Sequence, residues 1–150
     1  MKIYSRWKLM RKDKIVLTTG CFDLFHTGHL SLLKYCKSLG QYLIVGINSD
    51  DYVRATKGKN RPIIGENDRL KIIQSIKYVD FAYVFNSKSA VSEIQLIRPD
   101  IFVMNSESIK LFPEEVEAVV NSGGKIGVYD KTNNISTTNI IKVIKGENQC

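Results

Sequence analysis

Apolar runs alternate with stretches of helical spacing along most of this chain. The apolar runs predict buried β-strands at Ile15–Leu17, Tyr42–Asn48, Phe81–Phe85, Ile101–Met104 and Lys125–Tyr129. Apolar residues at helical spacing between these runs predict helices at Leu30–Leu39, Glu66–Ile76, Ala90–Ile97, Pro113–Val120 and Thr137–Ile144. Near-continuous apolar strands separated by helices are typical of a parallel sheet covered on both faces. The pattern therefore predicts an α/β fold built on five parallel strands.

The segment Gly20–His29, with the sequence GCFDLFHTGH, links the first predicted strand to the first predicted helix. A strand, a tight glycine turn and a helix start leave free backbone N–H groups that can surround an anion. His26 and His29 add imidazole donors at this junction. Two interpretations of the pair stay open, a phosphate-binding pair or a helix-capping pair without chemistry. Ligands of parallel α/β sheets bind beyond the carboxyl ends of the strands, where this segment falls.

The length and composition fit one folded domain. A chain of 150 residues with 43% hydrophobic residues can bury one sizeable core. It holds no apolar run near the roughly 18 residues that would span a bilayer, and Met1–Lys14 lacks the pattern of a signal peptide. The cysteines, Cys21, Cys36 and Cys150, are too few and too scattered for a disulfide framework. We therefore expect a cytoplasmic protein.

The net charge of +7 is concentrated at the start of the chain. The first fourteen residues hold one acidic residue, Asp13, against the basic residues Lys2, Arg6, Lys8, Arg11, Lys12 and Lys14. The rest of the chain is nearly neutral, and no predicted helix carries a basic stripe with interleaved aromatic residues. We therefore expect no nucleic-acid partner. We predict a basic N-terminal arm at 1–13, of a kind that is usually a solvated tail, and a single domain at 14–150.

Several short motifs occur in order across this predicted domain. They are GCFD at 20–23, HTGH at 26–29, KG at 57–58, RP at 61–62, DR at 68–69, YVD at 78–80 and ISTT at 135–138. With these motifs, and over Lys14–Lys145, the chain resembles the HxGH nucleotidyltransferase superfamily, which is cytidylyltransferase-like. The resemblance implies a Rossmann-like five-stranded parallel sheet with helices on both faces.

The resemblance also implies a reaction, in which a nucleoside monophosphate moves from ATP or CTP onto a phosphorylated sugar or polyol and pyrophosphate leaves. The sequences LIVGINSD at 43–50, NSGG at 121–124 and STTNII at 136–141 resemble adenylyltransferases that activate heptose 1-phosphate. FVM at 102–104 and YVD at 78–80 resemble glycerol-3-phosphate cytidylyltransferases, which make CDP-glycerol. The chain departs from both relatives at NSE 105–107, where they carry glycine-aspartate, and KTNN 131–134 lacks the arginine of the cytidylyltransferases. We expect ATP and a sugar phosphate, with CTP and a polyol as the alternative.

Candidate site residues follow from the matched motifs. The catalytic candidates are His26, His29 and Lys57. The histidines would donate to phosphate oxygens, and Lys57 would be a mobile cation on a flexible stretch, with Lys59 as its substitute. The nucleotide-binding candidates are Gly20, Cys21, Phe22, Gly28, Arg69, Ser136, Thr137 and Thr138; for Arg69 the resemblance is the sole argument. We expect Gly20 to allow a sharp turn, Gly28 to leave room for the triphosphate, and Asp23 to order the turn by accepting backbone N–H groups.

A zinc site and a non-catalytic function are the competing interpretations of these residues. A zinc site at Cys21, His26 and His29 would need a fourth ligand, which the sequence does not provide. We expect Mg²⁺ carried with the nucleoside triphosphate instead, with no protein metal site. The expected partners are the nucleotide and the phosphorylated sugar or polyol, with no membrane, and a homodimer is an open alternative. A non-catalytic nucleotide-binding regulatory domain also stays open, because a fold does not fix a function.

Overall fold

The structure is a computed structural model that describes residues 13–147. Its centre is a five-stranded sheet in the order β3-β2-β1-β4-β5, and every neighbouring pair of strands is parallel. The strands are β1 Ile15–Gly20, β2 Tyr42–Asn48, β3 Phe81–Phe85, β4 Ile101–Met104 and β5 Lys125–Val128. The helices are α2 Thr27–Ser38, α3 Asp50–Lys57, α4 Glu66–Gln74, α5 Val91–Ile97, α6 Ser106–Leu111, α7 Pro113–Asn121 and α8 Thr137–Ile144.

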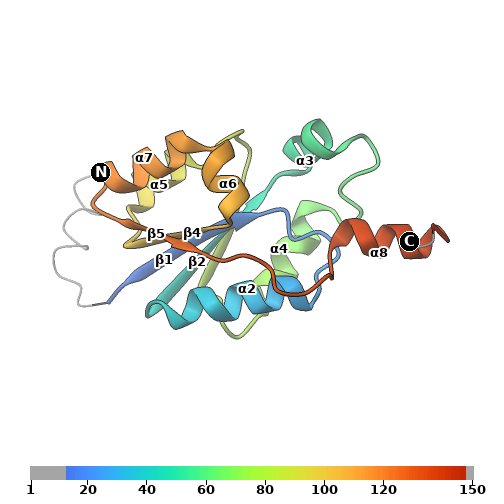
Figure 1. Cartoon of the computed structure of the whole chain (residues 1–150), viewed down its shortest axis with the longest axis horizontal. Helices are drawn as coiled ribbons and strands as arrows, with labels where there is room; N and C mark the ends of the chain where they lie inside the picture. Colours follow the sequence, from blue (N-terminus) through green and yellow to red (C-terminus); the bar gives the residue numbers. More distant parts are fainter. Residues whose placement is uncertain (1–12, 148–150) are drawn as a thin grey trace.

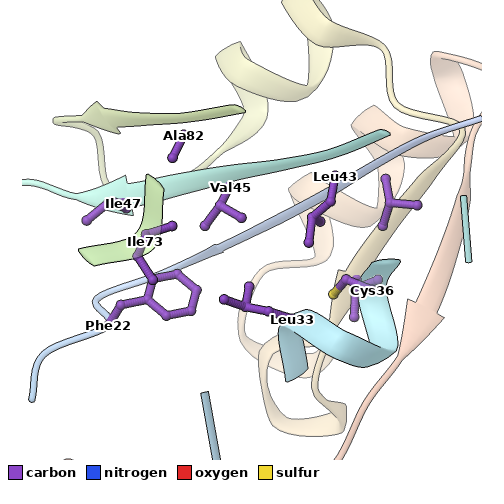
Figure 2. Close-up of a cluster of buried hydrophobic side chains, with 10 residues drawn as sticks. Phe22, Leu33, Cys36, Leu43, Val45, Ile47, Ile73 and Ala82 are labelled. Carbon is purple, nitrogen blue, oxygen red and sulfur yellow. The ribbon is translucent and has the colours of Figure 1, made fainter. Parts of the chain in front are cut away.

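Helices cover both faces of this sheet. Side chains from α2 and α4 pack on one face, in a core of Val16, Phe22, Leu33, Cys36, Leu43, Val45, Ile47, Ile73, Ala82 and Val103 (Figure 2). On the other face, α5 and α7 complete a core of Leu17, Phe85, Ala90, Ile94, Phe102, Met104, Ala118 and Val119. Figure 1 shows α5 and α7 above the sheet and α2 and α4 below it. The predicted Rossmann-like fold, a five-stranded parallel sheet with helices on both faces, is confirmed.

Two short helices, α3 and α6, are absent from the sequence prediction. Each begins at a polar cap directly after a strand: Ser49 Oγ accepts from the Tyr52 N–H at 3.2 Å, and Asn105 Oδ1 accepts from the Ser108 N–H at 2.7 Å. Val53 is the buried residue of α3, and α6 has none. Capping and local hydrogen bonds therefore form these helices, and hydrophobic periodicity gives little sign of them.

The order of the strands places a ligand site at one edge of the sheet. β1 pairs with β2 on one side and with β4 on the other, so the direction of winding reverses between β1 and β4. Parallel α/β sheets bind ligands beyond the carboxyl ends of the strands at this reversal. In Figure 1, α3 and α8 lie beyond that end of the sheet. The loop from β1 to α2 occupies the reversal itself.

Some sequence interpretations fall outside the described residues. The basic positions from Lys2 to Lys12 and Cys150 lie there, and the division into an arm at 1–13 and a domain at 14–150 stays a prediction. Cys21 and Cys36 are free. Within residues 13–147, no helix is long and apolar enough to cross a bilayer.

Candidate active site

A cavity of about 870 Å³ opens at the carboxyl ends of β1 and β4. The loop between β1 and α2, the end of α3 and the start of α8 contribute to its walls. The predicted site residues that line it are Gly20, Cys21, Phe22, His26, Gly28, His29, Lys57, Ser136, Thr137 and Thr138. Arg69 is the one predicted site residue that does not line it.

His26 and His29 form a reciprocal cap at the start of α2. The Gly28 N–H donates to His26 Nδ1 at 3.0 Å, and the His26 N–H donates to His29 Nδ1 at 3.3 Å. The two rings stack with their centroids 3.8 Å apart. The two histidines therefore do cap the helix, as one of the two interpretations predicts. Capping does not exclude phosphate binding, because both caps use Nδ1 and leave Nε2 of each ring for a ligand.

These capping bonds determine which ring nitrogen carries the proton. A neutral imidazole whose Nδ1 accepts a hydrogen bond carries its proton on Nε2. His26 Nε2 is buried and has no hydrogen-bond partner in the described part of the chain. Burial lowers the pKa of His26, and the charge of Lys131 lowers it further. Burial, His26 and Lys131 together lower the pKa of His29 to about 3. Without a ligand, the pair is neutral and carries its protons on Nε2.

This protonation state can be measured directly, because the chain holds only two histidines. We expect NMR of the imidazole nitrogens to show both rings as Nε2–H tautomers at neutral pH. His29 should stay neutral down to about pH 4, and His26 should titrate below the ordinary histidine pKa of about 6.5. Adding a nucleoside triphosphate should raise both pKa values, because an anion favours imidazolium. Titration of either ring near pH 6.5 without a ligand would contradict the assignment.

Gly28 and Gly20 make room for rings of this loop. A Cβ at Gly28 would lie 2.8 Å from His26 Cε1, so Gly28 allows the imidazole to fold back over the helix start. A Cβ at Gly20 would lie 3.1 Å from the Phe22 ring. The left-handed residues of the turn are Phe22, with φ 51°, and Leu24, with φ 46°. The expectation that Gly20 makes the turn is therefore corrected, because Gly20 ends β1 and the turn falls at Phe22 and Leu24. The expectation that Gly28 leaves room for the triphosphate stays a prediction.

Asp23 connects the turn to a distant segment. Its carboxylate accepts from Arg61 Nε at 2.9 Å, from the Ile63 N–H at 2.8 Å and from the Ile64 N–H at 3.0 Å. Burial raises the pKa of Asp23, but these three hydrogen bonds outweigh it and hold the pKa below its usual value. Asp23 accepts hydrogen bonds from backbone N–H groups, as expected. The donors, however, lie about forty residues along the chain and not in its own turn.

Arg69 is buried and does not face the cavity. Its guanidinium donates to the Ile64 carbonyl at 2.9 Å, to the Cys21 carbonyl at 2.6 Å and to Asp50 Oδ1 at 2.8 Å. The side chain is 0% exposed. All three of its nitrogens donate to internal acceptors and the side chain does not line the cavity, so the interpretation of Arg69 as a direct phosphate ligand is corrected. The sequence shows the residue on a helix but gives no sign of these long-range contacts.

Lys57 is the last residue of α3, directly before Gly58, and its role as a mobile cation stays a prediction. It lines the cavity, and Lys59 does not. Arg61, Lys88 and Lys131 also line the cavity, and the motif analysis did not assign them as site residues. Arg61 could have been found, because it belongs to one of the matched motifs. Its Nε contacts Asp23 and fixes the guanidinium at the cavity wall.

The start of α8 faces the same cavity. Ser136 Oγ accepts from the Asn139 N–H at 3.1 Å, which makes Ser136 the cap of this helix. Thr137 Oγ1 donates to the Asp23 carbonyl at 2.6 Å and so ties α8 to the loop after β1. Thr138 is exposed and lines the cavity. The first backbone N–H groups of a helix can bind phosphate oxygens. Here the first residues of α8 line the same cavity as His26 and His29.

The cavity also has an apolar wall, in which Phe102 and Met104 belong to the matched FVM motif and the other residues belong to none. Its apolar lining residues are Phe85, Phe102, Met104, Leu111 and Phe112. Glu115 from α7 is buried there, and Oε1 accepts from the Ala90 N–H at 2.7 Å. Burial raises the pKa of Glu115. In the sequence this residue looks like an ordinary acidic side chain of a first helical turn, so local reasoning could not place it in a site.

The positions where the chain departs from its relatives also meet at this edge. The Asp130 carboxylate accepts from the Ser106 N–H at 2.8 Å and from the Ser106 hydroxyl. Lys131 Nζ lies 3.4 Å from the Ile135 carbonyl. Ser106 of the segment 105–107 is thus bonded to Asp130, the residue directly before the segment 131–134, at the carboxyl ends of β4 and β5.

Comparison with known proteins adds independent findings. A family model described as cytidylyltransferase-like matches residues 17–143. The bifunctional protein HldE of Koribacter versatilis is 35% identical over 142 residues, which are 95% of this chain and 29% of that protein. HldE of Campylobacter fetus is 36% identical over 97% of this chain and 32% of that protein. The chain thus spans 29% and 32% of the length of these two relatives.

Solved structures share the fold. A lipopolysaccharide core biosynthesis protein from Thermoplasma volcanium superposes with a TM-score of 0.71 and 29% identity, over 81% of this chain and 99% of that one. A pantoate-beta-alanine ligase from Francisella tularensis, solved with beta-gamma ATP and beta-alanine, has a TM-score of 0.60 and 17% identity. That alignment covers 96% of this chain and 74% of the ligase. Similarity at that identity concerns the fold alone.

Proposed function

Because this chain belongs to the cytidylyltransferase-like family, we propose that it is a nucleotidyltransferase, which moves a nucleoside monophosphate onto a phosphorylated sugar or polyol and releases pyrophosphate. The observation that carries the proposal is the capped histidine pair. His26 and His29 line the cavity with Nδ1 occupied, and His26 Nε2 is buried with no hydrogen-bond partner among the residues that the structure describes. A buried donor of this kind is costly unless a ligand satisfies it.

The reaction asks the protein to neutralise charge. An acceptor phosphate is already an anion at neutral pH, so it can attack the α-phosphorus in line without a strong base. Negative charge then builds on the equatorial oxygens and on the leaving pyrophosphate. The Nε2–H groups of His26 and His29 would stabilise the α- and β-phosphate oxygens, and the start of α8 would receive the outer phosphates. Lys57 would bridge donor and acceptor phosphates, which must be held close together for reaction.

We propose ATP as the nucleotide and a sugar phosphate such as heptose 1-phosphate as the acceptor. The motif resemblance at 43–50 and 136–141 supports this choice, as does the absence of an arginine near Lys131. Lysine cannot replace the two-pronged donor that arginine provides. CTP with a polyol phosphate, which would give a CDP-polyol, is the alternative. The two small-molecule substrates and a cytoplasmic location are part of the proposal, and a homodimer is an open alternative.

Mg²⁺ would enter with the nucleoside triphosphate as part of the substrate. In the described part of the chain, no group of three or more His, Cys, Asp or Glu side chains could hold a metal ion. The Asp23 carboxylate is engaged by Arg61 and two backbone N–H groups. Triphosphate oxygens and water can supply the oxygen ligands that Mg²⁺ requires, so the cavity fits a nucleotide-borne ion.

A pyrophosphate-release screen tests this function. ATP and CTP would each be paired with heptose 1-phosphate and with glycerol 3-phosphate, in the presence of Mg²⁺. We expect turnover, with a larger kcat/KM for ATP than for CTP with the same acceptor. A tenfold preference for CTP, about 1.4 kcal/mol in the transition state, would reverse the nucleotide choice. Nucleotide binding without turnover for any pair would favour a regulatory domain.

A further inference from the structure

The segment that carries Lys57 is attached to the rest of the protein by buried charges at both ends. At its start, Asp50 in the first turn of α3 accepts from Arg69 Nη2 at 2.8 Å. At its end, the N–H groups of Ile63 and Ile64 donate to the Asp23 carboxylate at 2.8 and 3.0 Å. The side chains of Asp23 and Arg69 are both 0% exposed. Each attachment therefore has one member that is shielded from water, Asp23 at one end and Arg69 at the other, while Asp50 is 27% exposed.

Apolar packing does little to hold this segment. Val53 is the buried residue of α3, and residues 54–60 are exposed. A segment with few buried apolar contacts opens at a low free-energy cost unless polar contacts hold it. Breaking a buried hydrogen-bonded charge is costly, because the partner is left unsatisfied. The attachments at Asp23 and Arg69 thus decide how firmly Lys57 is placed.

The same two residues also contact the loop that carries the histidines. Asp23 belongs to that loop, and its carbonyl accepts from Thr137 at the start of α8. Arg69 donates to the carbonyl of Cys21, two residues before Asp23, and to the carbonyl of Ile64. The histidine loop, the Lys57 segment and the start of α8 therefore share one polar network.

We infer that Asp23 and Arg69 are positioning residues, which hold residues 50–64 so that Lys57 stays at the cavity opposite His26 and His29. The attachment stands on the contacts alone, whereas its consequence for turnover rests on the proposed function. Neither residue needs to touch a substrate. Each acts by fixing the distance between the cation and the imidazole donors, and a misplacement of a catalytic group by about 1 Å can lower a rate about a hundredfold.

Limited trypsin digestion of Asp23→Asn tests the attachment without any substrate. We expect cleavage after Lys57 and Lys59, identified by fragment mass, to accelerate about tenfold or more, because a loosened segment opens more often. Asp80→Asn is the matched control. Asp80 also accepts a backbone N–H, from Leu43 at 2.7 Å, and a cation, Lys37 at 2.6 Å, but neither it nor these partners line the cavity. Equal acceleration in both variants, or none in Asp23→Asn, would overturn the attachment.

A double-mutant cycle with Lys57→Ala tests the positioning role. We expect Asp23→Asn to lower kcat for pyrophosphate release about tenfold in the wild-type background and less than about twofold in the Lys57→Ala background, because coupled residues are not additive. An equal reduction in both backgrounds would mean a general structural effect and would overturn the role. If Asp23→Asn does not fold, Arg69→Lys, which keeps the charge but cannot keep three contacts, goes through both experiments. If the wild type releases no pyrophosphate, the proposed function fails while the digestion still decides the attachment.

Discussion

Replacing His26 by asparagine is expected to lower kcat for pyrophosphate release by about 10² to 10³, the usual effect of losing one preorganised donor. His26 lines the cavity and has two features: Nδ1 caps α2 through the Gly28 N–H, and the buried Nε2 has no hydrogen-bond partner within residues 13–147. Asparagine is among the best capping residues, so the variant keeps the cap of α2 and loses the Nε2–H donor of the histidine. Thermal unfolding should change little, while steady-state kinetics should show the loss in kcat.

His26→Ala separates the two roles of this residue. It removes the donor and the cap together, so we expect the same loss of turnover and, in addition, a loss of stability of about 0.5–2 kcal/mol. His29→Ala should lower the rate on a similar scale, because it removes the second Nε2–H. Should His26→Asn turn over at the wild-type rate, the histidine would be a capping residue only, and the catalytic assignment would be wrong.

Replacing Lys57 by alanine is expected to have the second largest effect, a decrease in kcat of about 10². A cation that contacts the phosphates of both substrates stabilises the transition state more than either bound substrate, so kcat should fall more than KM rises. Lys57 is exposed and lies at the end of a helix, so its replacement should leave unfolding nearly unchanged. Initial-rate kinetics with each substrate varied in turn would separate the two constants.

Lys59→Ala is the matched control for this variant. Lys59 lies two residues away, is exposed in the same way and does not line the cavity. We expect its replacement to change kcat by less than about threefold, because a surface charge away from the phosphates is screened by solvent and salt. A larger effect at Lys59 than at Lys57 would transfer the role of the cation to Lys59.

The elements that were predicted from the sequence are those with a strong apolar pattern. The runs at 42–48, 81–85 and 101–104 match β2, β3 and β4 at both ends, because strands of a parallel sheet covered by helices are nearly continuously apolar. α3 and α6 were missed because their stability comes from Ser49 and Asn105 caps and from neighbours far along the chain. Hydrophobic periodicity indicates helices with a buried apolar face, and α3 and α6 have almost no buried residues.

The candidate site divides in the same way. Residues in compact motifs, such as His26, His29 and Thr137, were named from the sequence and line one cavity. Arg69 and Asp23 were given the wrong partners, because their contacts join positions up to 48 residues apart. Glu115 was missed, since nothing local distinguishes a buried carboxylate from a solvated one. Local sequence motifs indicate which functional side chains are present, whereas the fold determines which of these side chains contact one another.

The hydrogen bond between Thr137 and the Asp23 carbonyl spans 114 positions of the chain. During synthesis on the ribosome, all five strands and the histidine loop emerge before α8 does. α8 has no buried residue, so the sheet can form around its two cores without this helix. The two cores can therefore be buried before α8 docks, and the cavity gains a helix start for the triphosphate only when Thr137 reaches the Asp23 carbonyl.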